Sequence, residues 1–549
     1  METFAPFRHR VFKWLWFASL ASNLGTFMHG IGAAWLITDL TTSAAVVSLL
    51  AVASALPTFL LALPAGALTD VLDRRRLLIG AQIWMAAIAA ILAVVAALDL
   101  VTIPSLLALT FLMGVGAALN MPVWAAIVPE LVPREDLPQA LVLNGTAFTA
   151  AQAIGPALGG LIVAASGVAA VFALNAVSFL GQIVVIWRWQ RPPDEHRLPA
   201  EHVVGAMRAG VRYLRFAPGL QTVLVRSGAF IFGMSALFAL LPTVGRAELG
   251  LGPAGYGLLF GALGIGSIAA TFLVPRVRGR LSLDALVAAG SVGMAVLIAG
   301  LGVAADPAPV YVLMAIGGLG QLAVMSSFNL AAQSSLPAWV RGRGLAVYTL
   351  AFQFAIAVGS LTWGALASAA GTRTALLAAA AVVLASNLLA FRFSLAGAAE
   401  SDMTPVHFPE PQVGATPDPD DGPVMVTAEW RIDPAERVAF TAAMEALRRA
   451  RRRDGAIRHG VWHDLNDPAR VVESYVVQSW AEHLRQRERA TEADRAAWVH
   501  ARAFHQGEDG VVVRWHLLLH PERTGTARSD DVEGAWHSKG HRREATELT

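Results

Sequence analysis

The sequence predicts an all-α membrane protein of twelve transmembrane helices in two six-helix bundles, followed by a small C-terminal α+β domain. The 549 residues are 55% hydrophobic and only 15% charged, and the mean hydropathy is +0.53. Ordinary soluble domains carry about 25% charged residues, and a soluble protein this apolar would expose large apolar patches. Long apolar runs also recur along the first 396 residues. Most of the chain is therefore expected to lie in a lipid bilayer.

Twelve apolar runs follow one another, and each has the length that a membrane span needs. About 20 mostly apolar residues cross the hydrocarbon core as a helix, and only a helix satisfies its own backbone groups in lipid. The runs cover 14–37, 46–69, 77–98, 103–128, 139–165, 168–189, 219–244, 254–275, 282–304, 309–333, 344–369 and 372–396. Only Ser166 and Gly167 separate the fifth run from the sixth, so the prediction of two spans there depends on these two residues.

Basic residues fall almost entirely on one side of the predicted spans. Eighteen arginines and lysines lie in segments on the side of the N-terminus, whereas the opposite loops carry two, Arg246 and Arg373. Cytoplasmic loops of membrane proteins are enriched in these residues. The sequence therefore predicts a multi-pass protein whose two termini are both cytoplasmic.

The two halves of the membrane region share a pattern. An arginine cluster follows the second run at 74–76, and another follows the eighth run at 276–280. Asn120 and Asn329 precede corresponding basic turns in the two halves. Such repeats are typical of secondary transporters, although apolar helices that end in arginine also resemble one another by chance. The first bundle, central loop and second bundle are expected at 1–190, 191–218 and 219–396.

Several classes of function have no support in the sequence. The chain contains no cysteine, which excludes disulfides and Cys-ligated metals. A formal net charge of +2 gives no indication of a nucleic-acid partner. The sequence has no glycine-rich phosphate loop that would indicate driving by ATP. We expect no cofactor, no metal and no enzymatic activity.

The segment 66–76, GALTDVLDRRR, resembles a known signature. It is similar to Gly-x-Leu-Ala-Asp-x-x-Gly-Arg-Arg, which follows the second helix in the major facilitator superfamily. The resemblance implies a gating role for Gly66, Asp70, Arg74 and Arg75, with Asp70 as part of a cytoplasmic latch. Asp73 stands where the signature has glycine. The alternative is a topology signal without a role in gating.

Two further segments resemble exporters of this superfamily. Gly155, Pro156, Gly159 and Gly160 match the exporter motif Gly-Pro-x-x-Gly-Gly, although small residues can also serve packing alone. The loop 129–145, PELVPREDLPQALVLNG, resembles the branch that contains the enterobactin exporter and the transmembrane secretion effectors. The resemblance covers residues 1–396 at least. It implies an exporter in a bacterial inner membrane.

Polar residues inside the predicted spans are the candidates for substrate contact, because a polar side chain in lipid is costly. The family resemblance implies that the first, fourth, seventh and tenth spans line the cavity. On that basis the candidates are Asn23, His29, Asn120, Trp124, Gln321, Asn329 and Gln333. For each amide alone, a hydrogen bond between helices is the alternative. For proton coupling, His29 and Asp39 are the candidates, with helix packing as the alternative for His29.

The composition changes after the twelfth run. Residues 397–423 are rich in proline and aspartate and predict a linker, and 521–549 are polar and predict disorder. Between them, 424–520 predict a ferredoxin-like βαββαβ domain. Its strands are expected at 424–432, 457–463, 471–480 and 511–519, and its helices at 434–453 and 481–505. The domain resembles antibiotic-biosynthesis monooxygenases, but its seven histidines show no known metal spacing, so a regulatory or dimerising module is expected.

These observations predict a secondary active transporter that exports small hydrophobic or amphipathic molecules, siderophore- or drug-like. The family resemblance implies proton coupling and alternating access. The expected partners are a small-molecule substrate, protons, the lipid bilayer and a second copy bound through the C-terminal domain. Three alternatives stay open: a membrane-tethered cofactor-independent oxygenase, a receptor that moves no solute, and an importer of the same fold.

Overall fold

The computed structural model describes residues 2–189, 212–337, 339–395, 402–406, 413–414, 417–506 and 510–518, with the backbone alone at 2, 3, 63, 67, 70 and 71. The predicted tail 521–549 and most of the central loop lie outside the described residues. The chain forms two compact units. The first comprises Met1–Gly205, Thr222–Gln333 and Leu345–Ala398. The second comprises Ala206–Gln221, Ser334–Gly344 and Ala399–Thr549.

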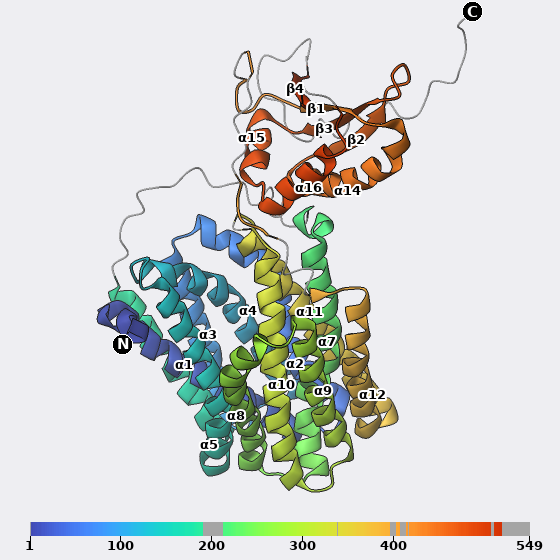
Figure 1. Cartoon of the computed structure of the whole chain (residues 1–549). Coiled ribbons are helices and arrows are strands. Elements are labelled where there is room, and N and C mark those ends of the chain that lie inside the picture. Colours follow the sequence, from blue (N-terminus) through green and yellow to red (C-terminus); the bar gives the residue numbers. More distant parts are fainter. Residues whose placement is uncertain are drawn as a thin grey trace, which may run out of the picture. The chain divides into compact units, whose positions relative to one another are not determined.

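Long helices build the membrane part of the chain (Figure 1). They are α1 (Arg10–Leu40), α2 (Ala44–Val71), α3 (Arg74–Ala97), α4 (Ile103–Ile127), α5 (Leu137–Arg188), α7 (Pro218–Thr243), α8 (Pro253–Arg278), α9 (Leu283–Val303), α10 (Pro307–Ser334), α11 (Arg341–Ala370) and α12 (Thr372–Ala385). Ten helices in the described ranges are long and apolar enough to cross a membrane. The chain is thus a predominantly helical, multi-pass membrane protein.

The 52-residue α5 is broken at Gly167. The backbone there has φ 78° and ψ 171°, which interrupts the helical geometry between the fifth and sixth apolar runs. Positive φ favours glycine, because a Cβ atom would clash with the backbone. The two runs predicted on either side of Ser166 and Gly167 therefore lie in separate helical segments.

Polar side chains at the first turns explain where several helices begin. Asp73 accepts a hydrogen bond from the Arg76 backbone N–H at 2.8 Å and so caps α3. Its φ is −62°, so the aspartate that replaces the signature's glycine occupies an ordinary backbone conformation. Thr102 and Ser105 form a capping box at the start of α4. Each cap fixes the residue at which its helix begins, so a defined turn precedes α3 and α4.

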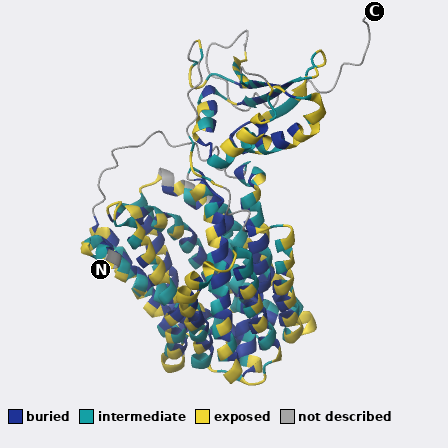
Figure 2. Cartoon of the chain, in the orientation of Figure 1, coloured by how far each residue is buried: buried dark blue, intermediate teal, exposed yellow. Residues whose placement is uncertain are grey.

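Exposed residues occur along the membrane helices (Figure 2), and many of them are large apolar residues. Phe272, Val177 and Ile83 are 63%, 61% and 52% exposed. A soluble protein would bury such side chains, because their hydration is unfavourable. Their position on the helix surfaces matches a protein whose solvent is lipid.

The second unit contains a four-stranded antiparallel sheet in the order β2-β3-β1-β4. Its strands are β1 (Val424–Arg431), β2 (Arg458–His463), β3 (Arg470–Val477) and β4 (Val512–Leu517). The helices are α14 (Arg437–Asp454), α15 (Trp480–Glu488) and α16 (Glu492–Arg502). Trp430, Phe440 and Leu447 belong to the buried core that joins the sheet to α14. We call residues 417–518 the tail domain.

The helix predicted at 481–505 is wrong, because this segment forms two helices, α15 and α16. Thr491 starts the second of them with a capping box, in which its backbone N–H and its hydroxyl both bond to the Asp494 carboxylate at 2.9 and 2.8 Å. An N-cap residue has non-helical backbone geometry, so it ends the helical continuity before it. The remaining strand and helix ranges lie within a few residues of those predicted.

Candidate functional site

A cavity of about 250 Å³ lies among α1, α2, α5, α7 and α8. Its walls are mainly aliphatic and aromatic, with Phe27, Phe238 and Phe260 among them. The side chains that offer hydrogen bonds are Thr26, Ser54, Thr149, Gln152, Tyr256 and Ser267. No charged side chain belongs to the described residues that line it. Such a cavity suits a neutral or amphipathic small molecule, because apolar contact supplies affinity and a few polar groups set orientation.

An ion pair closes one side of the first unit. We call the side where α1 ends the Asp39 face, and the side where α2 ends the arginine face. Arg246, in the short helix η3 (Val244–Glu248) after α7, donates to the carboxylate of Asp39 and to the Thr38 hydroxyl at 3.2 Å. Its Cζ atom also lies 5.0 Å from the centre of the Trp35 ring. A cation over an aromatic face adds to the attraction, so this latch joins the predicted first bundle to the second.

A crossing of small residues closes the same face at α5 and α8. A Cβ atom on Gly160 would lie 2.5 Å from the Pro253 carbonyl oxygen and 2.8 Å from Cα of Gly257. A Cβ atom on Gly155 or Gly159 would lie 2.8 Å from Phe27 or Met28 of α1. The predicted exporter motif therefore sits where α5 packs on α1 and α8 at van der Waals distance.

A second cavity, of about 520 Å³, lies among α5, α8 and α10. It reaches Arg278 at the end of α8, on the arginine face. Thr149 lines both cavities, so the two adjoin along α5. Thus α5 and α8 are in contact near the Asp39 face and leave space between them toward the arginine face.

The predicted cavity residues lie elsewhere on their helices. Of the described residues that line the 250 Å³ cavity, none belongs to that set. The Asn23 amide donates to Ser19 Oγ at 3.4 Å, and Asn120 accepts from Gln82 at 2.9 Å. Their substrate contacts stay predictions, and in this conformation both amides bond within the protein.

The other predicted cavity residues also lie away from the 250 Å³ cavity. His29 is 6% exposed and packs on Phe172, with ring centres 4.7 Å apart. Trp124 packs beside the buried cluster that includes Ile127, and Gln321 is half-buried. Asn329 and Gln333 are exposed and bond to each other near the arginine face.

The gating residues lie around the turn between α2 and α3. Arg74 pairs with Glu130 at 2.8 Å, and Arg75 donates to the Ile186 carbonyl at 3.0 Å. These contacts fix the turn to the ends of α4 and α5. Gly66 is half-buried in α2, and the side chain of Asp70 lies outside the described part of the chain.

The histidines of the tail domain serve several separate contacts. His459 bonds to Glu473 at 3.1 Å, His505 accepts from the Arg431 backbone N–H at 3.0 Å, and His483 accepts from Trp515 Nε1 at 2.9 Å. In the described residues, no group of three or more His, Cys, Asp or Glu side chains could hold a metal. The arrangement fits structural hydrogen bonding.

His483 predicts a pH dependence of the tail domain. Burial, with Arg487 and Arg451 nearby, lowers the pKa of His483 to about 3 from its usual 6.5. Between pH 6.5 and pH 3 the unfolded chain binds a proton at His483 that the folded domain does not bind. The free energy of unfolding therefore falls as the pH drops below about 6.5, by up to about 1.4 kcal/mol per pH unit. Thermal unfolding of the purified full chain should show this slope for the tail sheet. His483→Gln should flatten it, and the exposed His463→Gln should not; an equal slope in all three proteins would contradict the assignment.

Comparison with known proteins agrees with the fold. Residues 1–525 match the family model for transmembrane secretion effectors. The multidrug efflux pump Tap of Mycolicibacterium fortuitum is 27% identical over 388 residues, which cover 68% of this chain and 93% of that protein. Macrolide efflux protein A of Streptococcus pyogenes is 24% identical over 235 residues, covering 42% of this chain and 58% of that protein.

Solved structures share the fold at low sequence identity. A bacterial homologue of the human lysosomal transporter Spinster has a TM-score of 0.55 at 12% identity, covering 72% of this chain and 96% of that one. A bacterial homologue of the iron transporter ferroportin, in an inward-facing state, has a TM-score of 0.54 at 16% identity, covering 70% and 98%. The predicted major facilitator fold and the assignment as a transporter rather than an enzyme are confirmed. The chain belongs to the transmembrane secretion effector family of major facilitator transporters.

Proposed function

We propose that the chain is a proton-coupled secondary transporter that exports small hydrophobic or amphipathic molecules, drug- or siderophore-like, by alternating access. The observation that carries the proposal is the uncharged cavity among α1, α2, α5, α7 and α8, with its aromatic walls and its few polar groups. Two relatives named as efflux proteins, for several drugs and for macrolides, support the direction and the substrate class.

The proposed topology has twelve spans with both termini in the cytoplasm of a bacterial inner membrane. The ten apolar helices include α5 as a single helix, and its break at Gly167 divides it into two spans. The 31-residue α1 is not among the ten and is the twelfth span. The excess of basic residues makes the arginine face cytoplasmic. On this assignment the Asp39 latch and the crossing of α5 with α8 close the cavity toward the outside.

The proposal assigns gating to the turn between α2 and α3. Arg74 and Arg75 tie this turn to the ends of α4 and α5, so a movement of the first bundle carries the turn with it. Asp70 is the proposed latch toward the second bundle. Gly66, half-buried in α2, is proposed to allow close helix approach when the cytoplasmic side closes.

Asp39 is the proposed proton-coupling residue. A proton on its carboxylate would remove the charge that holds Arg246, so protonation from outside would release the latch. Asp39→Asn is expected to lower proton-driven accumulation by about tenfold, a loss of about 1.4 kcal/mol of coupling, while substrate exchange without a gradient continues. The measurement is transport in proteoliposomes with and without an imposed pH gradient.

His29→Gln is the matched variant for this test, because His29 is the other coupling candidate. It is expected to leave coupling unchanged, since the ring packs on Phe172 and belongs to neither cavity. Loss of coupling in His29→Gln, with coupling retained in Asp39→Asn, would transfer the role to His29.

The tail domain is proposed to be a ferredoxin-like, non-catalytic module that also offers a surface for a second copy. Its strand order β2-β3-β1-β4 supports this fold. Trp462 and Met425, 62% and 39% exposed on the sheet, support a dimer contact there. The resemblance to the monooxygenases and to the enterobactin-exporter branch stays a prediction.

Counterflow in proteoliposomes tests the transport function. Vesicles preloaded with each of a panel of unlabelled cationic drugs, macrolides and siderophores should transiently accumulate the matching labelled compound. Gln152→Ala should weaken this accumulation, because it removes the amide in the cavity wall. Binding without accumulation for every compound would favour a receptor, and gradient-driven transport toward the arginine face would favour an importer.

A further inference from the structure

Two segments of the membrane part belong to the same compact unit as the tail domain. One is Ala206–Gln221, described from Arg212, which leads directly into α7. The other is Ser334–Gly344, which joins α10 to α11. We call them the first and second loop segments. Because each is continuous with membrane helices, whatever holds these segments also restrains the ends of α7, α10 and α11.

Three arginines of the tail domain lie over three aromatic rings of the loop segments. The Cζ atoms of Arg453 and Arg452 lie 5.8 and 5.5 Å from the ring centres of Tyr213 and Phe216. Arg489 lies 4.6 Å from the ring centre of Trp339. A guanidinium over an aromatic face is attracted by the ring quadrupole, and the attraction grows when water is excluded.

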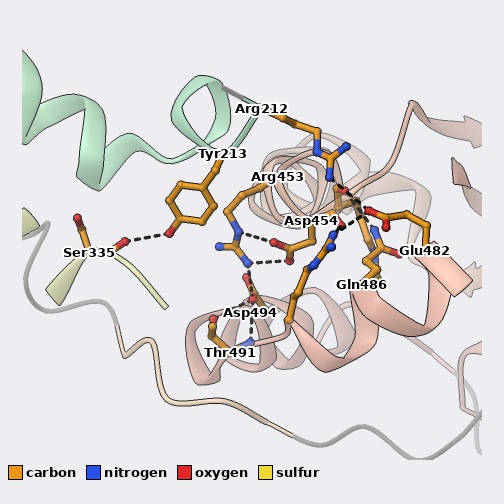
Figure 3. Close-up of polar contacts among 11 residues, drawn as sticks. Arg212, Tyr213, Ser335, Arg453, Asp454, Glu482, Gln486, Thr491 and Asp494 are labelled. Atoms are coloured by element: carbon orange, nitrogen blue, oxygen red, sulfur yellow. Dashed lines mark hydrogen bonds and ion pairs between the residues drawn. The ribbon is translucent and has the colours of Figure 1, made fainter. Parts of the chain in front are cut away.

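The loop segments are also held by polar contacts, drawn in Figure 3. Arg212 pairs with Glu482 at 3.3 Å, from the first segment to α15. The Tyr213 hydroxyl donates to the Ser335 carbonyl at 2.9 Å and so joins the two segments. Tyr213 is 1% exposed, and its ring meets that of Trp339 edge-on at 5.8 Å. Burial raises the pKa of Tyr213, so its hydroxyl stays protonated and remains a donor.

The arginines that meet the loops are fixed within the tail domain. Arg453 forms two 2.8 Å bonds to Asp454 and one of 2.7 Å to Asp494, the partner of Thr491 in the capping box of α16 (Figure 3). Arg489 donates to the Asp454 carbonyl at 2.9 Å and to Glu482 at 2.8 Å. Side chains that are already fixed lose little conformational entropy when they make a contact. These arginines therefore favour a specific interface over a non-specific one.

We propose that these contacts form a clamp through which the tail domain controls alternating access, an inference that rests on the proposed transport mechanism. The clamp fixes the spacing of the α7, α10 and α11 ends, and it is present together with closure of the Asp39 face. An interaction made in one conformation stabilises that conformation over the other. The clamp therefore favours the state closed at the Asp39 face, and loosening it releases the second bundle to open that face.

The chain offers a clean reporter for this equilibrium because it contains no cysteine. Ser48 is 1% exposed, and its Oγ atom lies against Gly364 where α2 meets α11 near the Asp39 face. Ser48→Cys is nearly isosteric, so the thiol should react with a membrane-impermeant maleimide added from that face only when the face opens. The reporter needs no substrate, so it reads the equilibrium independently of transport.

In the Ser48→Cys background, Tyr213→Ala with Trp339→Ala should raise the labelling rate about fivefold, because the two rings that pack edge-on in the clamp are removed. Tyr213→Phe keeps the ring and should give a smaller rise. Arg341→Gln is the matched control in the second loop segment, because Arg341 is exposed and belongs to none of the clamp contacts described above; it should leave the rate unchanged.

The outcomes separate the clamp from the transport function. Faster labelling in the clamp variants, graded from Tyr213→Phe to the double variant, supports the clamp. An unchanged or slower rate in the double variant, or an equal rise in Arg341→Gln, overturns it. If the wild-type protein shows no counterflow while the labelling still responds, the proposed function fails and the clamp stands.

Discussion

Gly160→Leu is expected to abolish export, with a loss of transport rate of more than about tenfold. A Cβ atom at this position would meet the Pro253 carbonyl oxygen and Cα of Gly257, and both are backbone atoms that cannot move aside. The side chain would force α5 and α8 apart where they close the Asp39 face, at a cost of about 1–3 kcal/mol for overpacking, or more. The transporter could then no longer complete the closed state of the cycle.

Gly181→Leu provides the control for this variant. Gly181 lies on the same helical element and is exposed, and a Cβ atom added to it would meet no described atom within 4 Å. Transport by Gly181→Leu should match the wild type in proteoliposomes, at equal protein amounts. Normal transport by Gly160→Leu would show that the close crossing of α5 and α8 has no part in the cycle.

Arg226→Met is expected to destabilise the membrane part by about 2–3 kcal/mol and to lower the amount of folded protein in the membrane. Arg226 is 2% exposed, pairs with Asp284 of α9 and donates to the Phe393 carbonyl at 3.3 Å. Removal of the arginine leaves the half-buried Asp284 carboxylate without this partner. The loss should appear as a lower yield of monodisperse protein and a lower unfolding temperature in detergent.

The double variant Arg226→Met with Asp284→Asn separates the effect of the unpaired Asp284 charge from the effect of lost packing. Asparagine keeps an oxygen that can accept from Ser394 Oγ, which lies 3.0 Å from the Asp284 carboxylate. We therefore expect the double variant to be more stable than Arg226→Met alone. If the double variant is as unstable as the single one, packing of the long side chain explains the loss, and the ion pair does not.

The helices were predictable from the sequence because the requirement for about 20 apolar residues per span is strict. The break at Gly167 was equally visible, since glycine suits the positive φ found there. The division of the predicted helix 481–505 was missed. Its signal was present as Thr491 followed by Asp494, which is a helix-start pattern within an otherwise helical stretch.

The cavity was harder to predict than the fold. In a helix that is apolar all round, the 3.6-residue periodicity does not distinguish the face toward lipid from the face toward a cavity. Selection of intramembrane amides consequently favoured side chains such as Asn120, which bonds to Gln82 in this conformation. Gln152, an amide three positions before the Gly155–Pro156 pair, was the available signal for the cavity.

Contacts between distant segments could not be predicted from one sequence. Asp39 was a candidate because an acid is rare near the spans, but nothing in the local pattern pairs it with Arg246, 207 residues away. Tyr213 and Trp339 likewise lie in separate loops without a shared motif, and only the folded chain brings their rings together. Long-range pairing of this kind is a property of the topology, which a local period does not encode.

Thr149 gives the most direct test of alternating access, because it lines both cavities and the chain has no native cysteine. The measurement is labelling of Thr149→Cys by a membrane-impermeant maleimide, applied to intact cells in one sample and to inverted vesicles in the other. The account predicts labelling of the whole population from either side, with rates that an imposed pH gradient changes in opposite directions. Labelling from one side only, whatever the gradient or the substrate present, would contradict it.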